Sequence, residues 1–212
     1  MAQRVWRSNY GLGTIYAELD KSKTSIMDLT QKVFDIAKDF GFVTRIEVTT
    51  ETAGDDAFVE SINLQKEQVF QPIEKMNITT ESPTKDFIAF IEEHHDVCKL
   101  YFYLSTTGVD EHDRTILLGG AVLLIFYLYP DEEWGMNIFI NTDIFVPFYR
   151  KKDGCTEAMA RANSPILKQL LENCLTIFPV TDWEWQETLP HMKEYLNYPL
   201  NNLLHNSEAN IN

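Results

Sequence analysis

One stretch near the start of this chain places apolar residues at helical spacing between a helix-capping residue and a helix-stopping one. Ile26, Leu29, Val33, Ile36 and Phe40 are three or four residues apart, and Ser25 and Gly41 flank them. This spacing predicts an amphipathic helix with one buried face. Serine favours the first cap of a helix and glycine its end, so the flanking residues agree with the pattern.

Two serine–proline pairs predict the starts of two more helices. Ser82-Pro83 precedes the apolar residues Phe87, Phe90 and Ile91, and Asn163-Ser164-Pro165 precedes a wide apolar face that runs to Phe178. Proline fits the first turn of a helix, where its missing N–H has no partner to lose. We therefore expect about three helices.

Alternation of apolar and polar residues predicts strands between these helices. The predicted strands cover residues 12–19, 42–49, 97–104, 115–129 and 136–148, with further candidates at 57–64 and 182–185. The fold class is thus α+β: a mainly antiparallel sheet of about five to six strands, ending in a long hairpin, with the helices packed on it. Two arrangements satisfy this order, a β-α-β-β-α-β core extended by a hairpin and a sheet covered on one face by helices.

The chain shows no repeat and no linker, so residues 1–212 are expected to form a single domain. A boundary near 65–82 is the weak point of that prediction, and 206–212 is expected to be a disordered tail. Residues 116–129 lack any charge, but a spanning helix needs about 20 apolar residues. The pair Gly119-Gly120 and the following Pro130 favour a long buried strand that is bent or bulged at the glycines.

Composition sets limits on the kind of partner. The chain carries 32 acidic residues against 18 Lys and Arg, a net charge of -14, and it is 44% hydrophobic. The apolar content is that of a folded domain. The charge argues against nucleic acid and anionic membranes, which bind through Lys and Arg, and favours a basic protein partner.

Cysteine usage and the N-terminus predict a cytoplasmic protein. Cys98, Cys155 and Cys174 form no C-x-x-C pair, and an odd number does not suggest a disulfide framework. We expect reduced thiols in the core. The first seven residues lack the apolar run of a signal peptide.

No residue spacing predicts a catalytic or metal site. The clusters His94-His95-Asp96 and Asp110-Glu111-His112-Asp113 could share a metal, but the strand between them would separate the two clusters by roughly 25 Å. The chain has no G-x-S-x-G motif, and Cys98 and Cys174 fall on apolar faces. We therefore predict no catalytic residue, no metal and no cofactor.

Two short segments combine acids with tryptophan and are the candidate partner-binding residues. They are Asp131, Glu132, Glu133 and Trp134 in one turn, and Asp182, Trp183, Glu184 and Trp185 near the end of the chain. If the second segment is extended, its tryptophans share one face and its acids the other. The tryptophans are then either core anchors or an exposed aromatic pair rimmed by carboxylates, as at binding hot spots.

These features favour a non-enzymatic protein-binding module that neutralises a basic partner. An immunity-type inhibitor of a cationic toxin has this physical character: small, acidic, single-domain and monomeric or homodimeric, without nucleic-acid or membrane partners. A second hypothesis is a structural or accessory subunit that pairs through the strand at 114–129. A third is an enzyme or small-ligand binder whose site is assembled from distant residues.

Overall fold

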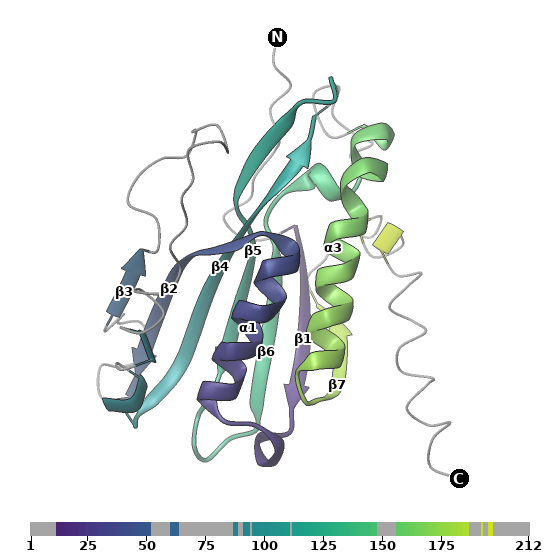
Figure 1. Ribbon diagram of the computed structural model, residues 1–212. Helices are drawn as coiled ribbons and strands as arrows, with labels where there is room; N and C mark the ends of the chain where they lie inside the picture. Colours follow the sequence, from purple (N-terminus) through teal and green to yellow (C-terminus); the bar gives the residue numbers. More distant parts are fainter. Residues whose placement is uncertain are drawn as a thin grey trace.

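The computed structural model in Figure 1 describes residues 12–51, 60–63, 87–88, 91–93, 95–110, 112–147, 156–186, 192 and 195–196. Their strands form one seven-stranded sheet in the order β3-β2-β4-β5-β6-β1-β7, and all neighbouring strands are antiparallel. The strands are β1 (Gly13–Leu19), β2 (Phe42–Thr50), β3 (Glu60–Asn63), β4 (Val97–Val109), β5 (Thr115–Tyr127), β6 (Trp134–Ile140) and β7 (Val180–Trp185). The helical elements are α1 (Ile26–Phe40), α3 (Glu157–Ile177) and the 3-10 turns η1 (Lys21–Lys23) and η4 (Asp143–Phe145), and residues 87–88 and 91–93 are also helical. The predicted α+β fold class is confirmed.

Helix α1 connects β1 to β2, two parallel strands that three other strands separate. The chain therefore crosses one face of the sheet, and α1 and α3 lie side by side on that face (Figure 1). The Ser25 hydroxyl accepts from the N–H of Asp28 at 3.1 Å, and the Asp28 carboxylate accepts from the N–H of Ser25 at 3.2 Å. This capping box begins the helix where the sequence predicts. Of the two predicted arrangements, the sheet covered on one face by helices is the observed one.

The two faces of the sheet carry different residues because side chains alternate along each strand. The helix-covered face holds the core, in which Phe102 of β4 is fully buried. Its ring meets Phe34 of α1, Phe87 and Phe126 edge to face, with ring centroids 5.9–6.3 Å apart. The opposite face is built from the residues between these core positions; no helix of the described residues lies on it, and we call it the helix-free face.

The long β4–β5 hairpin changes register at Ser105, as the Gly119-Gly120 pair predicts. Gly120 has φ +59°, and its N–H donates to the Ser105 hydroxyl at 2.8 Å. Only glycine adopts this backbone conformation at little cost, so the bulge forms at that position. Along Val122–Tyr127, β5 is paired on both sides, to β4 and to β6, whereas its residues 115–118 pair with β4 alone among the described strands.

The start of α3 differs from the prediction. The helix begins at Glu157 with Thr156 as its cap, so Asn163, Ser164 and Pro165 lie inside it. Proline removes the hydrogen bond to the carbonyl of Arg161. Both residues lie on the exposed side of α3, where water can bind that carbonyl.

Several other predictions can be compared only in part. Of the candidate strand at 57–64, residues 60–63 form β3, and β6 ends at Ile140 instead of 148. The predicted helix start at Ser82-Pro83, the possible boundary at 65–82 and the tail at 206–212 lie outside the described residues, as do His94, Glu111 and Cys155. Within the described ranges, no helix is both long and apolar enough to cross a membrane.

Candidate functional site

Tyr16 lies on the helix-free face near the β7 edge of the sheet, above a glycine. It belongs to β1, and Gly135 of β6 lies beside it, opposite Glu18. A Cβ at Gly135 would be 3.0 Å from Cε2 and 3.1 Å from the hydroxyl of Tyr16. The absence of a side chain at Gly135 therefore lets the tyrosine ring lie down on the strand.

Four acidic residues lie around this tyrosine. Glu18 is two positions along β1, Asp182 and Glu184 are the β7 partners of Glu18 and Tyr16, and Glu133 directly precedes β6. All four are exposed. Burial, followed by the charges of Glu18, Glu133 and Glu184, raises the pKa of Tyr16. We call Tyr16 and these four acids the Tyr16 patch.

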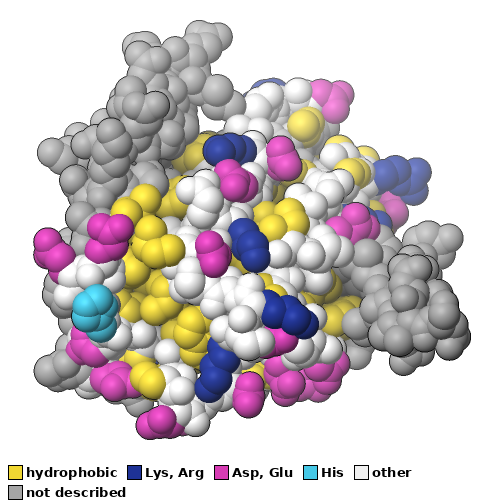
Figure 2. Space-filling model, turned by 60° about the horizontal axis from the view of Figure 1, so that its bottom comes forward, with side chains coloured by type: hydrophobic (Ala, Val, Ile, Leu, Met, Phe, Trp, Pro, Cys, Tyr) yellow, Lys and Arg dark blue, Asp and Glu magenta, His cyan; other side chains and the backbone are white. Residues whose placement is uncertain are grey.

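The strand order brings together the two acidic segments that the sequence singles out. β1 lies between β6 and β7, so Glu133 at the start of one strand and Asp182 and Glu184 in the other flank the same strand. Lys21 holds the turn before β6 in place, because its ammonium donates to the carbonyls of Pro130 and Glu132 at 3.3 and 3.0 Å. Figure 2 turns this end of the molecule forward, and acidic side chains gather along the lower edge of the view.

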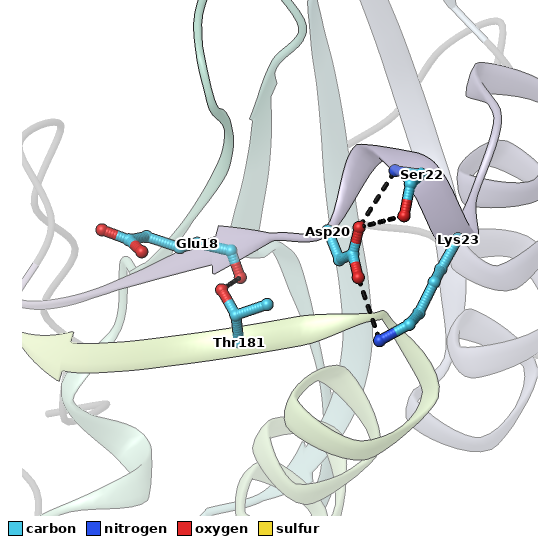
Figure 3. A network of polar contacts seen from close by, with 5 residues as sticks. All are labelled: Glu18, Asp20, Ser22, Lys23 and Thr181. Carbon is cyan, nitrogen blue, oxygen red and sulfur yellow. Dashed lines mark hydrogen bonds and ion pairs between the residues drawn. The ribbon is translucent and has the colours of Figure 1, made fainter.

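The carboxylates of Glu18, Glu133 and Glu184 form no ion pair with any other described residue. Asp20, two residues after Glu18, is the contrast. Its carboxylate accepts from the N–H and hydroxyl of Ser22 at 3.0 and 2.6 Å and pairs with Lys23 at 2.9 Å. These bonds lower the pKa of Asp20 to about 2. In Figure 3 the Glu18 side chain extends away from this network, and only its carbonyl is engaged, by Thr181.

The three candidate tryptophans lie on the other face. Trp134 and Trp183 are register partners of Leu19 and Ala17 of β1, and Trp185 is the partner of Ile15, so all three share the helix-covered face. They are partly buried and pack against the core. The acids Asp182 and Glu184 lie on the opposite face, as the alternation predicts for an extended segment. The indole N–H groups of Trp183 and Trp185 are buried without a hydrogen-bond partner among the described residues.

On the part of the helix-free face that β2, β4 and β5 form, basic residues lie among tyrosines. Glu47 of β2 is 2% exposed; it forms an ion pair with Arg45 and accepts from the Tyr103 hydroxyl at 2.6 Å. Burial and this hydrogen bond raise the pKa of Tyr103. The Lys99 ammonium lies 5.9 Å from the ring centre of Tyr127. Arg45 and Lys99 are thus already in contact with acidic or aromatic groups of the protein, whereas the carboxylates of Glu18, Glu133 and Glu184 pair with no described basic residue.

Of the residues considered for metal or nucleophile chemistry, Asp110 has a structural role and two cysteines are buried. Asp110 accepts from the N–H groups of His112 and Arg114 at 2.8 and 2.9 Å and pairs with the Arg114 guanidinium, which closes the β4–β5 turn. Cys98 and Cys174 are buried free thiols, and burial raises the pKa of Cys174. No group of three His, Cys, Asp or Glu positioned for a metal occurs in the described part of the chain.

Comparisons with protein-family models, with curated proteins and with solved structures found no match for this chain. The Tyr16 patch is therefore described from its geometry alone. Sequence reasoning selected Glu133, Asp182 and Glu184 but missed Tyr16 and Glu18. Their only signal was their place in the predicted first strand, beside buried residues, and the adjacency of β1 to both acidic segments depends on the strand order.

Proposed function

We propose that this protein is a protein-binding module that holds a basic protein partner at the Tyr16 patch. One observation carries the proposal: four exposed carboxylates surround a half-buried tyrosine, and none of them pairs with a basic residue of the described chain. Two exposed acids elsewhere, Asp35 and Glu157, are instead paired with Lys38 and Arg161 on their own helices.

The chemistry of the patch suits an arginine or lysine side chain of the partner. A cation can stack on the tyrosine ring while the surrounding carboxylates accept its hydrogen bonds. Tyrosine is enriched at binding hot spots because it provides a large contact area with few rotatable bonds. The ring of Tyr16 occupies the space that a side chain at Gly135 would need.

The net charge of -14 would speed the encounter with such a partner. An immunity-type inhibitor, which covers the basic surface of a toxin such as a nuclease, is the specific form of this function that we favour. Occlusion requires binding only, and a small acidic domain without a catalytic group is sufficient for it.

The test is the salt dependence of binding to a basic protein that the wild-type chain retains from its native cell extract at low salt. Once that partner is purified, we expect its association rate to fall steeply between low and physiological ionic strength. The variant Glu18→Gln/Glu133→Gln/Glu184→Gln should associate at least tenfold more slowly at low salt, because three steering charges are lost.

The matched control is Asp39→Asn/Glu92→Gln/Glu93→Gln, which removes three exposed charges away from the patch. It should keep most of the wild-type rate. Equal rates for the two triple variants, or an association rate that does not change with salt, would exclude binding at the Tyr16 patch by charge.

A further inference from the structure

Strand β7 is the last strand of the sheet, so one of its two backbone edges has no neighbouring strand within the described part of the chain. In an antiparallel pair, alternate residues direct their N–H groups toward the partner strand. Gln186 donates to the carbonyl of Thr14 at 2.9 Å, which places Glu184 and Asp182 in the same phase, with their N–H groups toward β1. The N–H groups of Trp183 and Trp185 are therefore directed outward, to the free edge.

The outward N–H of Trp183 is already occupied. It donates to Oδ1 of Asp182, the preceding residue, at 2.8 Å. The Asp182 carboxylate thus covers the donor that a further strand would need at the middle of β7. Asp182 is exposed and forms no ion pair with a described residue, so neither packing nor charge pairing explains this arrangement.

The start of β7 is also irregular. Its register to β1 shifts between Glu18 and Leu19, and Thr181 is the extra residue that this bulge accommodates. The Thr181 hydroxyl donates to the carbonyl of Glu18 at 3.5 Å, as Figure 3 shows. A bulge and a charged residue are the devices by which natural sheets prevent edge-to-edge pairing.

We propose that Asp182 protects the β7 edge against pairing with β7 of a second copy of this chain. The segment Val180–Trp185 has two tryptophans on one face and is β-prone, so two such edges could pair in antiparallel fashion around a two-fold axis. Each copy would then use the N–H of Trp183 in the new ladder. The Asp182 carboxylate occupies that donor and brings a negative charge to the edge. The inference is independent of the basic partner proposed above.

The test is Asp182→Ala, compared with two variants in the same strand. Glu184→Ala removes the same charge from the same face, but the N–H of the residue after it is not capped by Glu184. Asp182→Asn removes the charge and keeps an oxygen that can accept from Trp183. We expect sedimentation velocity to show self-association of Asp182→Ala at least tenfold stronger than that of the wild type. In the variant, the Trp183 N–H of each of the two copies is free to donate across the new strand pair. Glu184→Ala and Asp182→Asn should behave as the wild type does.

A second measurement keeps the result decisive if association is weak. In dilute samples, the amide of Trp183 should shift in the NMR spectrum of Asp182→Ala and exchange faster with solvent, whereas in Glu184→Ala it should be unchanged. Equal association of Asp182→Ala and wild type, or an unmoved Trp183 amide, would overturn the proposal. Equal association of Asp182→Ala and Glu184→Ala above wild type would also overturn it, because charge alone would then protect the edge.

Discussion

Asn163 and Val109 form a reciprocal pair of hydrogen bonds between a helix side chain and a strand backbone. The Asn163 amide donates to the Val109 carbonyl at 2.8 Å, and its oxygen accepts from the Val109 N–H at 2.8 Å. The same amide also donates to the carbonyl of Met159 at 2.8 Å. The Asn163 side chain therefore pairs with the Val109 backbone as a neighbouring strand would, and it links α3 to the end of β4.

Asn163→Ala should destabilise the protein by about 2 kcal/mol, because it leaves the two backbone groups of Val109 without partners in a partly buried position. The measurement is the free energy of unfolding in urea. Gln169→Ala, at an exposed position of the same helix whose side chain bonds only to Asn173, should change it by less than about 0.5 kcal/mol. Similar losses for the two variants would show that the bonds to Val109 contribute little.

Gly135→Ala should displace the Tyr16 ring, because the new methyl group would lie 3.0 Å from Cε2. The expected loss is about 1 kcal/mol of unfolding free energy, the lower end of the cost of overpacking. In a Tyr16→Leu background the same change should be neutral or slightly stabilising, since alanine restricts the unfolded chain. The double-mutant cycle measures this coupling, and a coupling energy of zero would contradict the contact.

Alkaline titration should show that Tyr103 resists ionisation. Burial and the hydrogen bond to Glu47 raise the pKa of Tyr103 above its ordinary value of about 10. The folded state favours the protonated phenol, so this stabilisation is complete below pH 10 and is lost as the pH rises further. Absorbance at the phenolate band should show a late phase that Tyr103→Phe removes and Glu47→Gln moves to lower pH. A late phase that survives in Tyr103→Phe would assign it to another tyrosine.

Acid should weaken the turn between β4 and β5. Hydrogen bonds from the Arg114 side chain, together with the N–H groups of Arg114 and His112, lower the pKa of Asp110 to about 2. The folded state favours the carboxylate, so the stabilisation is present above pH 4 and is lost as the pH falls from about 4 to about 2.

Unfolding free energies of Asp110→Asn should therefore change less over that range than those of the wild type. Asp113→Asn removes a charge from the same turn without removing the acceptor of these bonds, and it should keep the wild-type slope. If Asp110→Asn also keeps that slope, the hydrogen bonds to Asp110 do not depend on its charge.

The sequence predicts most of this fold because local patterns determine its elements. The stripe from Ile26 to Phe40 and the capping box at Ser25 specify α1, and Gly120 marks the bulge. The start of α3 was misplaced because a serine–proline pair resembles a helix start. Nothing local shows that Asn163 bonds to a strand 54 residues away.

The candidate site could be predicted only in part for the same reason. Alternation places the acids Asp182 and Glu184 opposite the tryptophans, and this requires no knowledge of the sheet order. Glu133 lies near Asp182 and Glu184, beside Tyr16, because β1 lies between β6 and β7. This pairing joins segments more than 100 residues apart, and single-sequence patterns carry no information on it.

The register change at Ser105 divides the long hairpin into two independently aligned halves. A one-residue slip in the outer half, where Thr106 pairs with Leu118, would have to cross the Gly120 bulge to reach the inner half. The inner half carries Lys99, Tyr101 and Tyr103 on the helix-free face. Because of the bulge, a pairing error at the hairpin tip does not change which side chains of the inner half lie on that face. The tip can therefore change in sequence or length without turning these residues toward the core.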